Sequence, residues 1–355
     1  MNMRIKNALD LSDADEMLVS DPAAIFYLIN KRFSPGERFL GLLIKKDTRP
    51  KLFLNVLFPC EEIDGVDIIS INDTDVLSDV LSRYIDPSSV LGVDKTLQAR
   101  FLLPMQEAKI ASSFINGSLA VDKARAIKDE EEKQLMRKAS KINDEAMAIF
   151  KTLVKEDVSE KQVADQFMDI YKSLGGEGFS FDPIVAFGKN AADPHHEPDN
   201  TKPQPGDAVL IDVGCIYKGY CSDMTRTFFF KKGPNKDQEE IYNLVRKANE
   251  DAENCIKEGV RLCDIDKAAR DVIQNGGYGR YFNHRLGHFI GIEDHEYGDV
   301  SSVFKDECKA GNIFSIEPGI YDPERMGCRI EDLVIVTEDG CEVLNSYPHD
   351  IEIIG

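Results

Sequence analysis

The 355-residue sequence has no apolar run that reaches the roughly 18 to 20 residues needed to cross a bilayer. Its first residues, Met1-Asn2-Met3-Arg4, are not followed by the apolar core of a signal peptide. Basic residues are in deficit, and the net charge of −20 argues against nucleic acids and anionic membranes as partners. We therefore expect a cytoplasmic protein.

The eight cysteines form no CxxC pair and no compact framework of the kind found in small secreted proteins. Most of them are therefore predicted to be reduced, buried, small apolar fillers. Cys215 and Cys221 stand close to two aspartates discussed below. A thiolate metal site is the weaker reading of this pair, because the spacing matches no zinc pattern.

Residues 1–124 contain no histidine and no glycine-rich phosphate loop, so we expect no chemistry in them. Apolar periodicity predicts a small α/β domain here, whose role is to support dimerisation or to wall the active site. Its predicted strands are 16–19, 39–44, 52–57, 66–71 and 90–93, and its predicted helices are 75–85 and 97–110. The chain is long enough for a second domain, which we expect at 125–355.

This second part begins with a long amphipathic helix, predicted from Ile127 onward. Asp129 and Glu132 have the spacing of a capping box at its start. Another helix is predicted over 159–174, where it stops at a pair of glycines.

The second part also contains an internal repeat of about a hundred residues. Gly206 precedes Asp212 by the same six-residue step by which Gly311 precedes Glu317. The repeat predicts two helix-helix-hairpin halves that fold against each other about a pseudo-two-fold axis.

Two predicted hairpins carry carboxylates where plain core strands would carry Val or Ile. The first, 209–230, has Asp212 on one arm and Asp223 on the other; the second, near 312–336, has Glu317 and Glu331. A carboxylate in an apolar strand is costly to bury unless a cation or donor satisfies it. In one hairpin alone, solvated or salt-bridged acids would be as good an interpretation as a metal site. The pseudo-symmetry, however, predicts that all four acids meet at one interface.

Histidines gather near these acids. Five of the six lie in two clusters, which are His195/His196 and His284/His288/His295. Four carboxylates with one imidazole can hold two divalent ions, and such an oxygen-rich set favours Mn²⁺, with Co²⁺, Fe²⁺ and Zn²⁺ as alternatives. Two ions that share one water activate it near neutral pH and polarise a carbonyl, which suits amide hydrolysis.

The flanking motifs resemble those of a known family. IDVG, SDMTRT, HRLGH, SIEPGIY and RIEDLVIV are similar to the five-ligand signature of the metallopeptidases of the prolidase, aminopeptidase P and methionine aminopeptidase group. The resemblance covers the whole chain and implies an α+β fold. It implies an N-terminal non-catalytic α/β domain of the creatinase/prolidase type over 1–124 and a pseudo-two-fold pita-bread catalytic domain over 125–355.

The resemblance also implies the metal ligands. Asp212 would be a bidentate ligand of one ion, and Asp223 and Glu331 would bridge both ions. His288 and Glu317 would bind the other ion.

Further roles follow from the same resemblance. Glu317 is implied as the proton shuttle, and His295 as the group that contacts the scissile amide or the oxyanion. His195 would lie on the substrate side, His284 would line the catalytic pocket, and Arg329 would pair with a ligating aspartate. We expect His196 to point away from the site.

The sequence departs from the family pattern at two common glycine positions, which are Arg285 and Phe289 here. Phe289 is expected to narrow the site or alter its wall. Some prolidases have a carboxylate-binding arginine at the position of Asp299, and we hypothesise that Arg285 grips the substrate carboxylate instead. An outward salt bridge of Arg285 is the alternative.

The implied activity is dinuclear metal-dependent hydrolysis of Xaa-Pro dipeptides, with a small peptide as substrate and a homodimer as the assembly. The alternative is an aminopeptidase P that removes the N-terminal residue from longer Xaa-Pro peptides. A metal-free binding or creatinase-like protein is less favoured, because such relatives are expected to have replaced the ligands, and all five are present.

Overall fold

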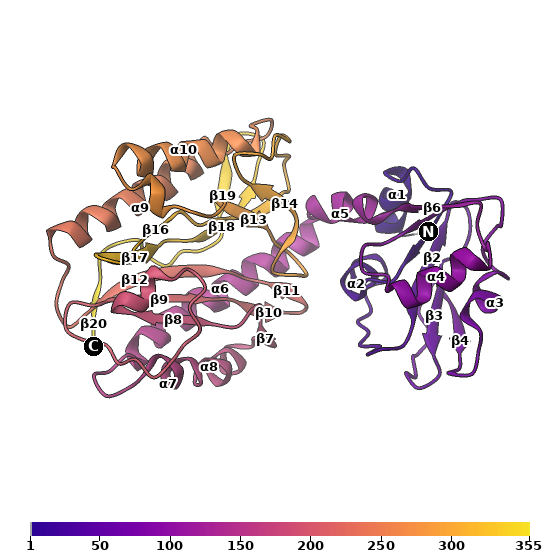
Figure 1. Cartoon of the computed structure of the whole chain (residues 1–355), viewed down its shortest axis with the longest axis horizontal. Coiled ribbons are helices and arrows are strands. Elements are labelled where there is room, and N and C mark those ends of the chain that lie inside the picture. Colours follow the sequence, from indigo (N-terminus) through magenta and orange to yellow (C-terminus); the bar gives the residue numbers. More distant parts are fainter. Residues whose placement is uncertain (1) are drawn as a thin grey trace. The chain divides into compact units, whose positions relative to one another are not determined.

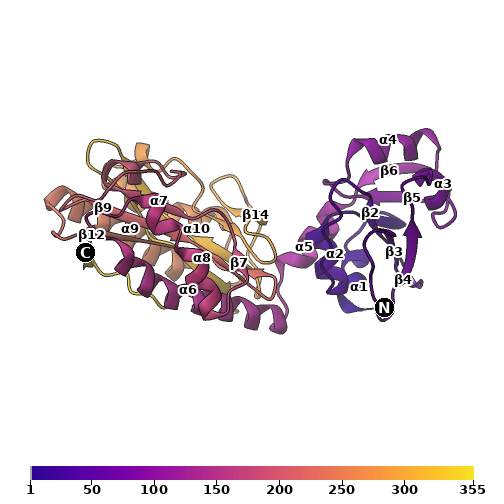
Figure 2. The same ribbon diagram turned by 90° about the horizontal axis from the view of Figure 1, so that it is seen from below.

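The computed structural model describes residues 2–355 of the chain. The chain forms two compact units that divide between Arg125 and Ala126 (Figures 1 and 2). Helix α5 (Ser118–Ala126) runs across this division.

The N-terminal unit is built on one mixed six-stranded sheet, with strand order β4-β3-β2-β1-β5-β6. Strands β1, β2 and β3 pair antiparallel, whereas β1–β5, β3–β4 and β5–β6 are parallel pairs. The remaining elements precede α5, and in chain order they are α1 (Met3–Asp10), β1 (Glu16–Val19), α2 (Pro22–Ile29), β2 (Leu40–Lys45), β3 (Lys51–Asn55), β4 (Asp67–Ile71), α3 (Leu77–Leu81), β5 (Val90–Val93), α4 (Ala99–Glu107) and β6 (Ser113–Asn116).

The predicted strands of this unit agree with β1 to β5 to within two residues at each end. Four elements, α1, α2, β6 and α5, were not predicted. Helix α2 is apolar on nearly all sides, so it lacks the one-sided periodicity that identifies a surface helix. Strand β6 has only four residues, too few to show a clear alternation.

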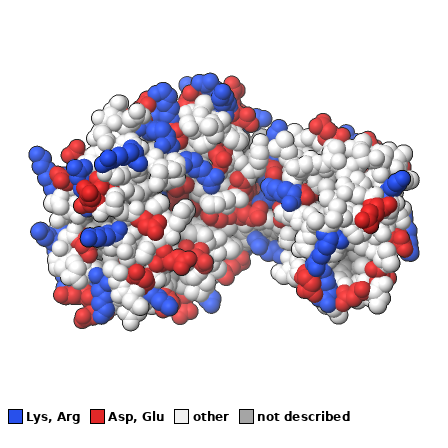
Figure 3. Space-filling model, viewed as in Figure 1, with Lys and Arg blue, Asp and Glu red and all other residues white. Residues whose placement is uncertain are grey.

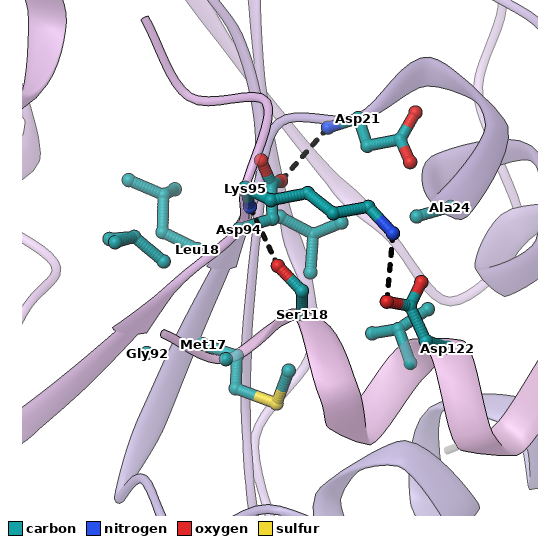
Figure 4. A pocket seen from close by; sticks show the side chains of 13 residues that line it. Met17, Leu18, Asp21, Ala24, Gly92, Asp94, Lys95, Ser118 and Asp122 are labelled. Carbon is teal, nitrogen blue, oxygen red and sulfur yellow. Dashed lines mark hydrogen bonds and ion pairs between the residues drawn. The ribbon is translucent and has the colours of Figure 1, made fainter. Parts of the chain in front are cut away.

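A small cavity lies beside β1 and β5 of this unit (Figure 4). At its edge, Lys95 Nζ donates to Asp122 Oδ2 at 2.8 Å, and the Lys95 backbone amide donates to Ser118 Oγ at 2.6 Å. The cavity volume is about 10 Å³, which is room for a single water molecule. These polar contacts therefore tie the start of α5 to the sheet, and the cavity cannot hold a substrate.

The second unit has two halves of similar construction. The first half contains α6 (Glu130–Leu153), α7 (Glu160–Ala164), α8 (Phe167–Leu174), β7 (Gly178–Phe179), β8 (Ile184–Phe187), the 3₁₀ helix η1 (Gly188–Ala192), β9 (Ala208–Val213), β10 (Cys215–Tyr217), β11 (Tyr220–Cys221) and β12 (Met224–Phe230). The second contains α9 (Lys236–Cys255), α10 (Leu262–Asn275), η2 (Gly279–Tyr281), β13 (Gly287–Phe289), β14 (Glu296–Val300), β15 (Ile313–Ile316), β16 (Gly319–Asp322), β17 (Met326–Arg329), β18 (Asp332–Val336), β19 (Cys341–Val343) and β20 (Ile353–Ile354).

The strands lie between two layers of helices, with α9 and α10 on one side and α6, α7 and α8 on the other (Figure 1). One sheet has the order β20-β12-β9-β8 and another has β14-β13-β15-β18-β19. Gly206 and Gly311, the repeated glycines of the sequence, both have left-handed backbones with φ of +96° and +91°. The two halves therefore repeat the same turn before β9 and β15, as the internal repeat predicted.

Local sequence sets the helix ends. Asp129 and Glu132 form the predicted capping box at the start of α6. The single helix predicted over 159–174 is wrong in one respect, because it is divided into α7 and α8. At the break, the Gln166 amide bonds to Val163 O, three residues back, so the α-helical hydrogen-bond pattern is interrupted.

The first hairpin is present, as predicted. Strands β9 and β12 pair antiparallel with Asp212 opposite Thr225. The turn between β10 and β11 is made by Lys218 and Gly219, both with positive φ, as a type I′ turn requires.

The second hairpin is one long ribbon that opens in its middle. The pairs Ile316–Asp332 and Gly319–Arg329 belong to the same register, although β15–β18 and β16–β17 are separate ladders. Glu317 and Glu331 therefore lie opposite each other in the gap between the ladders.

The packing of β9 determines where its aspartate points. Val209, Ile211 and Val213 pack in the apolar cluster with α6 and α8, whereas Leu210 packs in the cluster with α9 and α10. Because side chains alternate along a strand, Asp212 shares the face of Leu210 and points toward the second half. The pseudo-symmetric interface is thus where the acids meet.

Two further properties concern the surface. Within residues 2–355, no helix is both long and apolar enough to span a membrane. On the face shown in Figure 3, acidic and basic side chains are intermixed, and basic residues form no continuous patch on that face.

Candidate metal centre

The four hairpin acids converge with one histidine between the two halves of the second unit. Asp212, Asp223 and Glu331 each place a carboxylate oxygen within 4.8 Å of one another, and so do ligand atoms of His288, Glu317 and Glu331. The two groups share Glu331, so the set has the form of two adjoining cation sites. The sequence-predicted ligands are all brought together.

Asp212 is held by a buried arginine. Arg329 from β17 makes a short hydrogen bond through Nη2 to Asp212 Oδ2, and its Nε donates to Thr225 Oγ1 at 3.0 Å. The Arg329 side chain is 3% exposed. This arrangement leaves Asp212 Oδ1 buried and without a hydrogen-bond partner among the described residues.

Glu331 and Asp223 complete the first group from opposite hairpins. Thr225 Oγ1 donates to Glu331 Oε2 at 2.6 Å, and the Glu331 amide bonds to Thr225 O at 3.1 Å. Asp223 Oδ1 is buried and also lacks a partner within residues 2–355. Because an unpaired buried carboxylate is costly, the donor set fits a divalent cation.

His288 lies on β13, beside the second group. Its Nε2 is 3.5 Å from Asp223 Oδ2 and 3.5 Å from Glu317 Oε1. Ser315 Oγ accepts from the His288 backbone amide at 3.0 Å, which fixes the strand that carries the imidazole. The ring is buried and faces the acids, as a metal ligand requires.

The ionisation of the cluster follows from burial and crowding. Burial raises the pKa of Glu317 to about 8, and it raises the pKa values of Asp223 and Glu331 well above their usual range, with further increases from neighbouring acids. Burial lowers the pKa of His288 well below its usual value. A cation among these groups opposes the rise in the carboxyl pKa values and favours the neutral imidazole of His288, which is the electrostatic pattern expected of metal ligands.

His284 belongs to a hydrogen-bond chain that reaches Asp212. Its Nε2 is 3.0 Å from Tyr321 Oη, and Arg329 Nη1 donates to the same hydroxyl at 2.7 Å. Burial, with Arg329 next in importance, lowers the pKa of His284 to about 4, so the ring is neutral at pH 7. Tyr321, four residues after Glu317 in SIEPGIY, is a contributor that the sequence reasoning missed.

His195 and His295 line the same cavity from two loops. The His295 ring packs against His288 with the ring centroids 4.1 Å apart, and its side chain is 61% exposed. Partial removal of the ring from solvent, where it packs against His288, lowers the pKa of His295, and the charge of Arg285 is the second cause. The cavity volume is about 620 Å³, within the roughly 300 to 1,000 Å³ usual for small-ligand sites.

Comparison with known proteins agrees with this geometry. Residues 134–338 match the metallopeptidase family M24, and residues 3–127 match the creatinase/prolidase N-terminal domain. The chain belongs to the M24 metallopeptidase family. Its catalytic unit has the pita-bread fold, and its N-terminal unit is the creatinase-type domain.

Relatives span nearly the whole chain. An uncharacterized peptidase of Staphylococcus epidermidis is 40% identical over 350 residues, covering 97% of this chain and 98% of the relative. The Xaa-Pro dipeptidase from Bacillus anthracis superposes with a TM-score of 0.91 at 31% identity, covering 99% and 98% of the two chains. The X-Pro aminopeptidase from Thermotoga maritima has a TM-score of 0.87 at 28% identity, covering 98% and 99%.

Arg285 of this M24 peptidase lines the cavity and makes a short ion pair with Asp299. Both side chains are partly exposed, at 35% and 40%. The pair has features of both interpretations of Arg285, since the side chain is salt-bridged and also lines the cavity.

Phe289 does not line the cavity. Its side chain is 4% exposed and packs in the apolar core, with its ring centroid 5.3 Å from that of Phe314. A Cβ on Gly298, which has φ of +122°, would lie 2.5 Å from the Phe289 ring. The expectation that Phe289 narrows the site is therefore wrong, because the ring turns into space that the glycine leaves open.

The two cysteines near the acids are also outside the ligand groups. Cys215 Sγ is 3.6 Å from Ala139 O, and Cys221 Sγ is 3.5 Å from Ile292 O. No disulfide joins any two cysteines within residues 2–355. The candidate site is thus made of carboxylates and imidazole, without thiolate.

The loop that carries His195 is held by a buried acid that the sequence reasoning missed. Glu160 of α7 has a fully buried side chain and accepts hydrogen bonds from the Phe187 amide at 2.6 Å and the Asp199 amide at 3.1 Å. His196 Nε2 is 2.7 Å from Glu160 Oε2. The ring of His196 is therefore engaged by Glu160 rather than by the five predicted ligands.

Asp294 is the other missed residue. It lines the cavity, and one of its oxygens lies within 4.8 Å of ligand atoms of Asp223 and His288. Burial raises the pKa of Asp294 to about 7, with Asp212 as the second cause. In the sequence it stands in the acidic stretch IEDHE, which is typical of a solvated loop.

Proposed function

We propose that this M24 peptidase is a dinuclear metal-dependent Xaa-Pro dipeptidase. Its two divalent ions would be held by Asp212, Asp223, His288, Glu317 and Glu331. The observation that carries the proposal is the convergence of these five side chains in a cavity of about 620 Å³, in a chain similar along its length to an Xaa-Pro dipeptidase. Four carboxylates and one imidazole favour Mn²⁺ over softer ions.

When bound, two such ions would polarise the carbonyl that precedes proline and lower the pKa of a water molecule beside it. Glu317 would accept the proton of the attacking water and pass it to the leaving imino nitrogen. His295 is neutral at pH 7, so its N–H can donate to the developing oxyanion.

The other residues position these groups. Arg329 holds Asp212 in one orientation, and the His284–Tyr321 hydrogen bond in turn supports Arg329. His195 faces the cavity from the opposite loop and would contact the substrate. Arg285 would bind the free carboxylate of a dipeptide, with Asp299 orienting the guanidinium.

The alternative is an aminopeptidase that removes the first residue from longer Xaa-Pro peptides. The similarity to the X-Pro aminopeptidase from Thermotoga maritima favours keeping this candidate. A metal-free role is disfavoured, because none of the five ligand positions is replaced.

A substrate panel tests the proposal. Xaa-Pro dipeptides and matched Xaa-Pro-Yaa tripeptides are assayed with chelated protein reloaded with Mn²⁺, Co²⁺ or Zn²⁺. We expect dipeptide hydrolysis to exceed tripeptide hydrolysis and to be highest with Mn²⁺. Preference for tripeptides would replace the proposal by the aminopeptidase, and hydrolysis of neither would remove both. Sedimentation of the loaded enzyme tests the proposed homodimer.

A further inference from the structure

Asp294 belongs to a ligand group that the five-residue set does not explain. It lies on the loop between β13 and β14, and the ligand atoms of Asp223, His288 and Asp294 are all within 4.8 Å of one another. Two of these three residues already belong to the proposed metal centre. The third adds a carboxylate on the side where His288 lies.

The environment of this carboxylate resembles that of the proposed ligands. Asp294 Oδ1 is buried and has no hydrogen-bond partner among the described residues, a property it shares with Asp212 Oδ1 and Asp223 Oδ1. The Asp223 side chain in the same group is only 6% exposed. Leaving such oxygens buried without a donor or cation destabilises the folded chain. Three orphaned oxygens around one cavity therefore indicate that bound cations satisfy them.

We propose that Asp294 is a sixth protein ligand of the metal centre and binds the same divalent ion as His288 and Asp223. This inference rests on the proposed function for the presence of two ions. Charge balance supports it. The five carboxylates and the buried Arg329 leave four negative charges, before water or substrate is counted, and two divalent ions match that number.

The added oxygen ligand has a consequence for metal choice. Hard ions such as Mn²⁺ accept many oxygen ligands, whereas Zn²⁺ is commonly satisfied by four. Asp294 should therefore strengthen the binding of Mn²⁺ more than that of Zn²⁺.

A different role for Asp294 would be to orient His295, since Asp294 Oδ2 is 3.5 Å from His295 Nε2. That distance is long for a charge-assisted hydrogen bond. The two roles make different predictions: loss of an orienting contact changes kcat and leaves metal affinity unchanged, whereas loss of a ligand weakens metal binding directly.

Calorimetric titration of the chelated full-length protein with Mn²⁺ and with Zn²⁺ separates these outcomes. Asp294→Asn is compared with wild type and with Asp182→Asn, a control in which an exposed acid of the same cavity is changed. We expect Asp294→Asn to lower the binding affinity for one of the two Mn²⁺ ions by about 10-fold to 100-fold or more, and to lower the affinity for Zn²⁺ by a smaller factor. Asp182→Asn should bind both ions as wild type does. Unchanged binding by Asp294→Asn would overturn the proposal.

Thermal melts give a second readout, in which the variant should differ from wild type in opposite directions: a higher Tm without metal and a smaller gain in Tm when metal is added. Chelated Asp294→Asn should melt above chelated wild type, because one of several crowded like charges is gone. Its gain in Tm on addition of Mn²⁺ should be smaller than that of wild type. A lower Tm without metal together with an unchanged gain would indicate a purely structural role.

One measurement needs no variant. In a crystal structure of the Mn²⁺-loaded wild type, an Asp294 oxygen should lie within about 2.0 to 2.6 Å of an ion, as oxygen ligands do. A separation well beyond this range from both ions would refute the inference. Wild type that binds two ions through Asp294 yet cleaves no Xaa-Pro peptide would remove the proposed function and leave this inference standing.

Discussion

The crowded acids predict that removal of metal makes stability depend steeply on pH. A carboxyl whose pKa is raised in the folded state holds its proton more tightly there than in the unfolded chain. The free energy of unfolding therefore falls as the pH rises from the unfolded pKa toward the folded one. For Glu317 this range runs from 4.5 to about 8.

The magnitude can be worked from this one residue. Each unit of pKa difference corresponds to about 1.4 kcal/mol, so chelated protein should lose about 4 kcal/mol between about pH 5 and about pH 8 from Glu317 alone. Asp294, whose pKa is raised to about 7, titrates in the same cluster, so its contribution is not simply added. For a unit of this size the loss corresponds to a fall in Tm of roughly 8 to 16 °C.

The assay is thermal unfolding, followed by circular dichroism, of chelated and Mn²⁺-loaded protein across this pH range. Glu253 supplies an internal background, because burial and then Asp332 raise its pKa to about 8 outside the metal cavity. Its slope should appear in both samples, so the difference between them isolates the metal centre. Glu317→Gln should reduce the slope of the chelated protein, since the contribution of this one carboxyl is gone while the other raised acids remain.

Two results would refute this reasoning. In one, chelated and loaded protein show the same dependence of Tm on pH, which would mean that the acids are not neutralised by metal. In the other, chelated protein is more stable at pH 8 than at pH 5, which would mean that the folded pKa values are not raised.

Three further predictions concern single side chains. Arg285→Ala should lower kcat/KM for a dipeptide with a free carboxylate by about 10-fold to 100-fold, since charged hydrogen bonds contribute about 1.5 to 3 kcal/mol, and should leave kcat/KM for the corresponding dipeptide amide nearly unchanged. Arg280→Ala, which lies outside the cavity, is the control. Equal losses on both substrates would contradict the carboxylate role. Arg329→Met should lower the free energy of unfolding by about 3 to 5 kcal/mol in denaturant titrations, because the buried ion pair with Asp212 is broken. An unchanged midpoint of unfolding would show that this ion pair does not stabilise the fold. Glu160→Gln should raise KM, because it loosens the loop that carries His195, while two metal ions stay bound. Steady-state kinetics and elemental analysis measure the two properties. Loss of metal instead would place Glu160 in the metal centre itself.

Much of the candidate site was predictable because its residues stand in local patterns. Carboxylates that interrupt apolar strands are visible without a structure, and the repeat indicates that two such hairpins face each other. The capping box at Asp129 was equally readable, because it depends on residues three positions apart. Short or uniformly apolar elements such as β6 and α2 were missed, since they carry no clear periodicity.

The residues that were missed depend on distant partners. Glu160 lies on a helix 27 residues before Phe187 and accepts a hydrogen bond from the Phe187 backbone amide. Nothing in the sequence around Glu160 indicates that its side chain is buried. Tyr321 meets His284 only because β16 passes beside the loop before β13. Asp294 stands in an acidic stretch that reads as solvated, yet the fold turns it into the cavity.

The sequence by itself determined which side chains carry charge within apolar strands, and through its repeat it determined that those strands come in a matched pair. Only the tertiary structure decided which further groups join them, namely the anchor of the His195 loop, the hydroxyl beside Arg329 and the additional acid at Asp294. The physical reason is that strand alternation and helix capping act over a few residues, whereas burial and the pairing of charges depend on chain segments that meet only after folding.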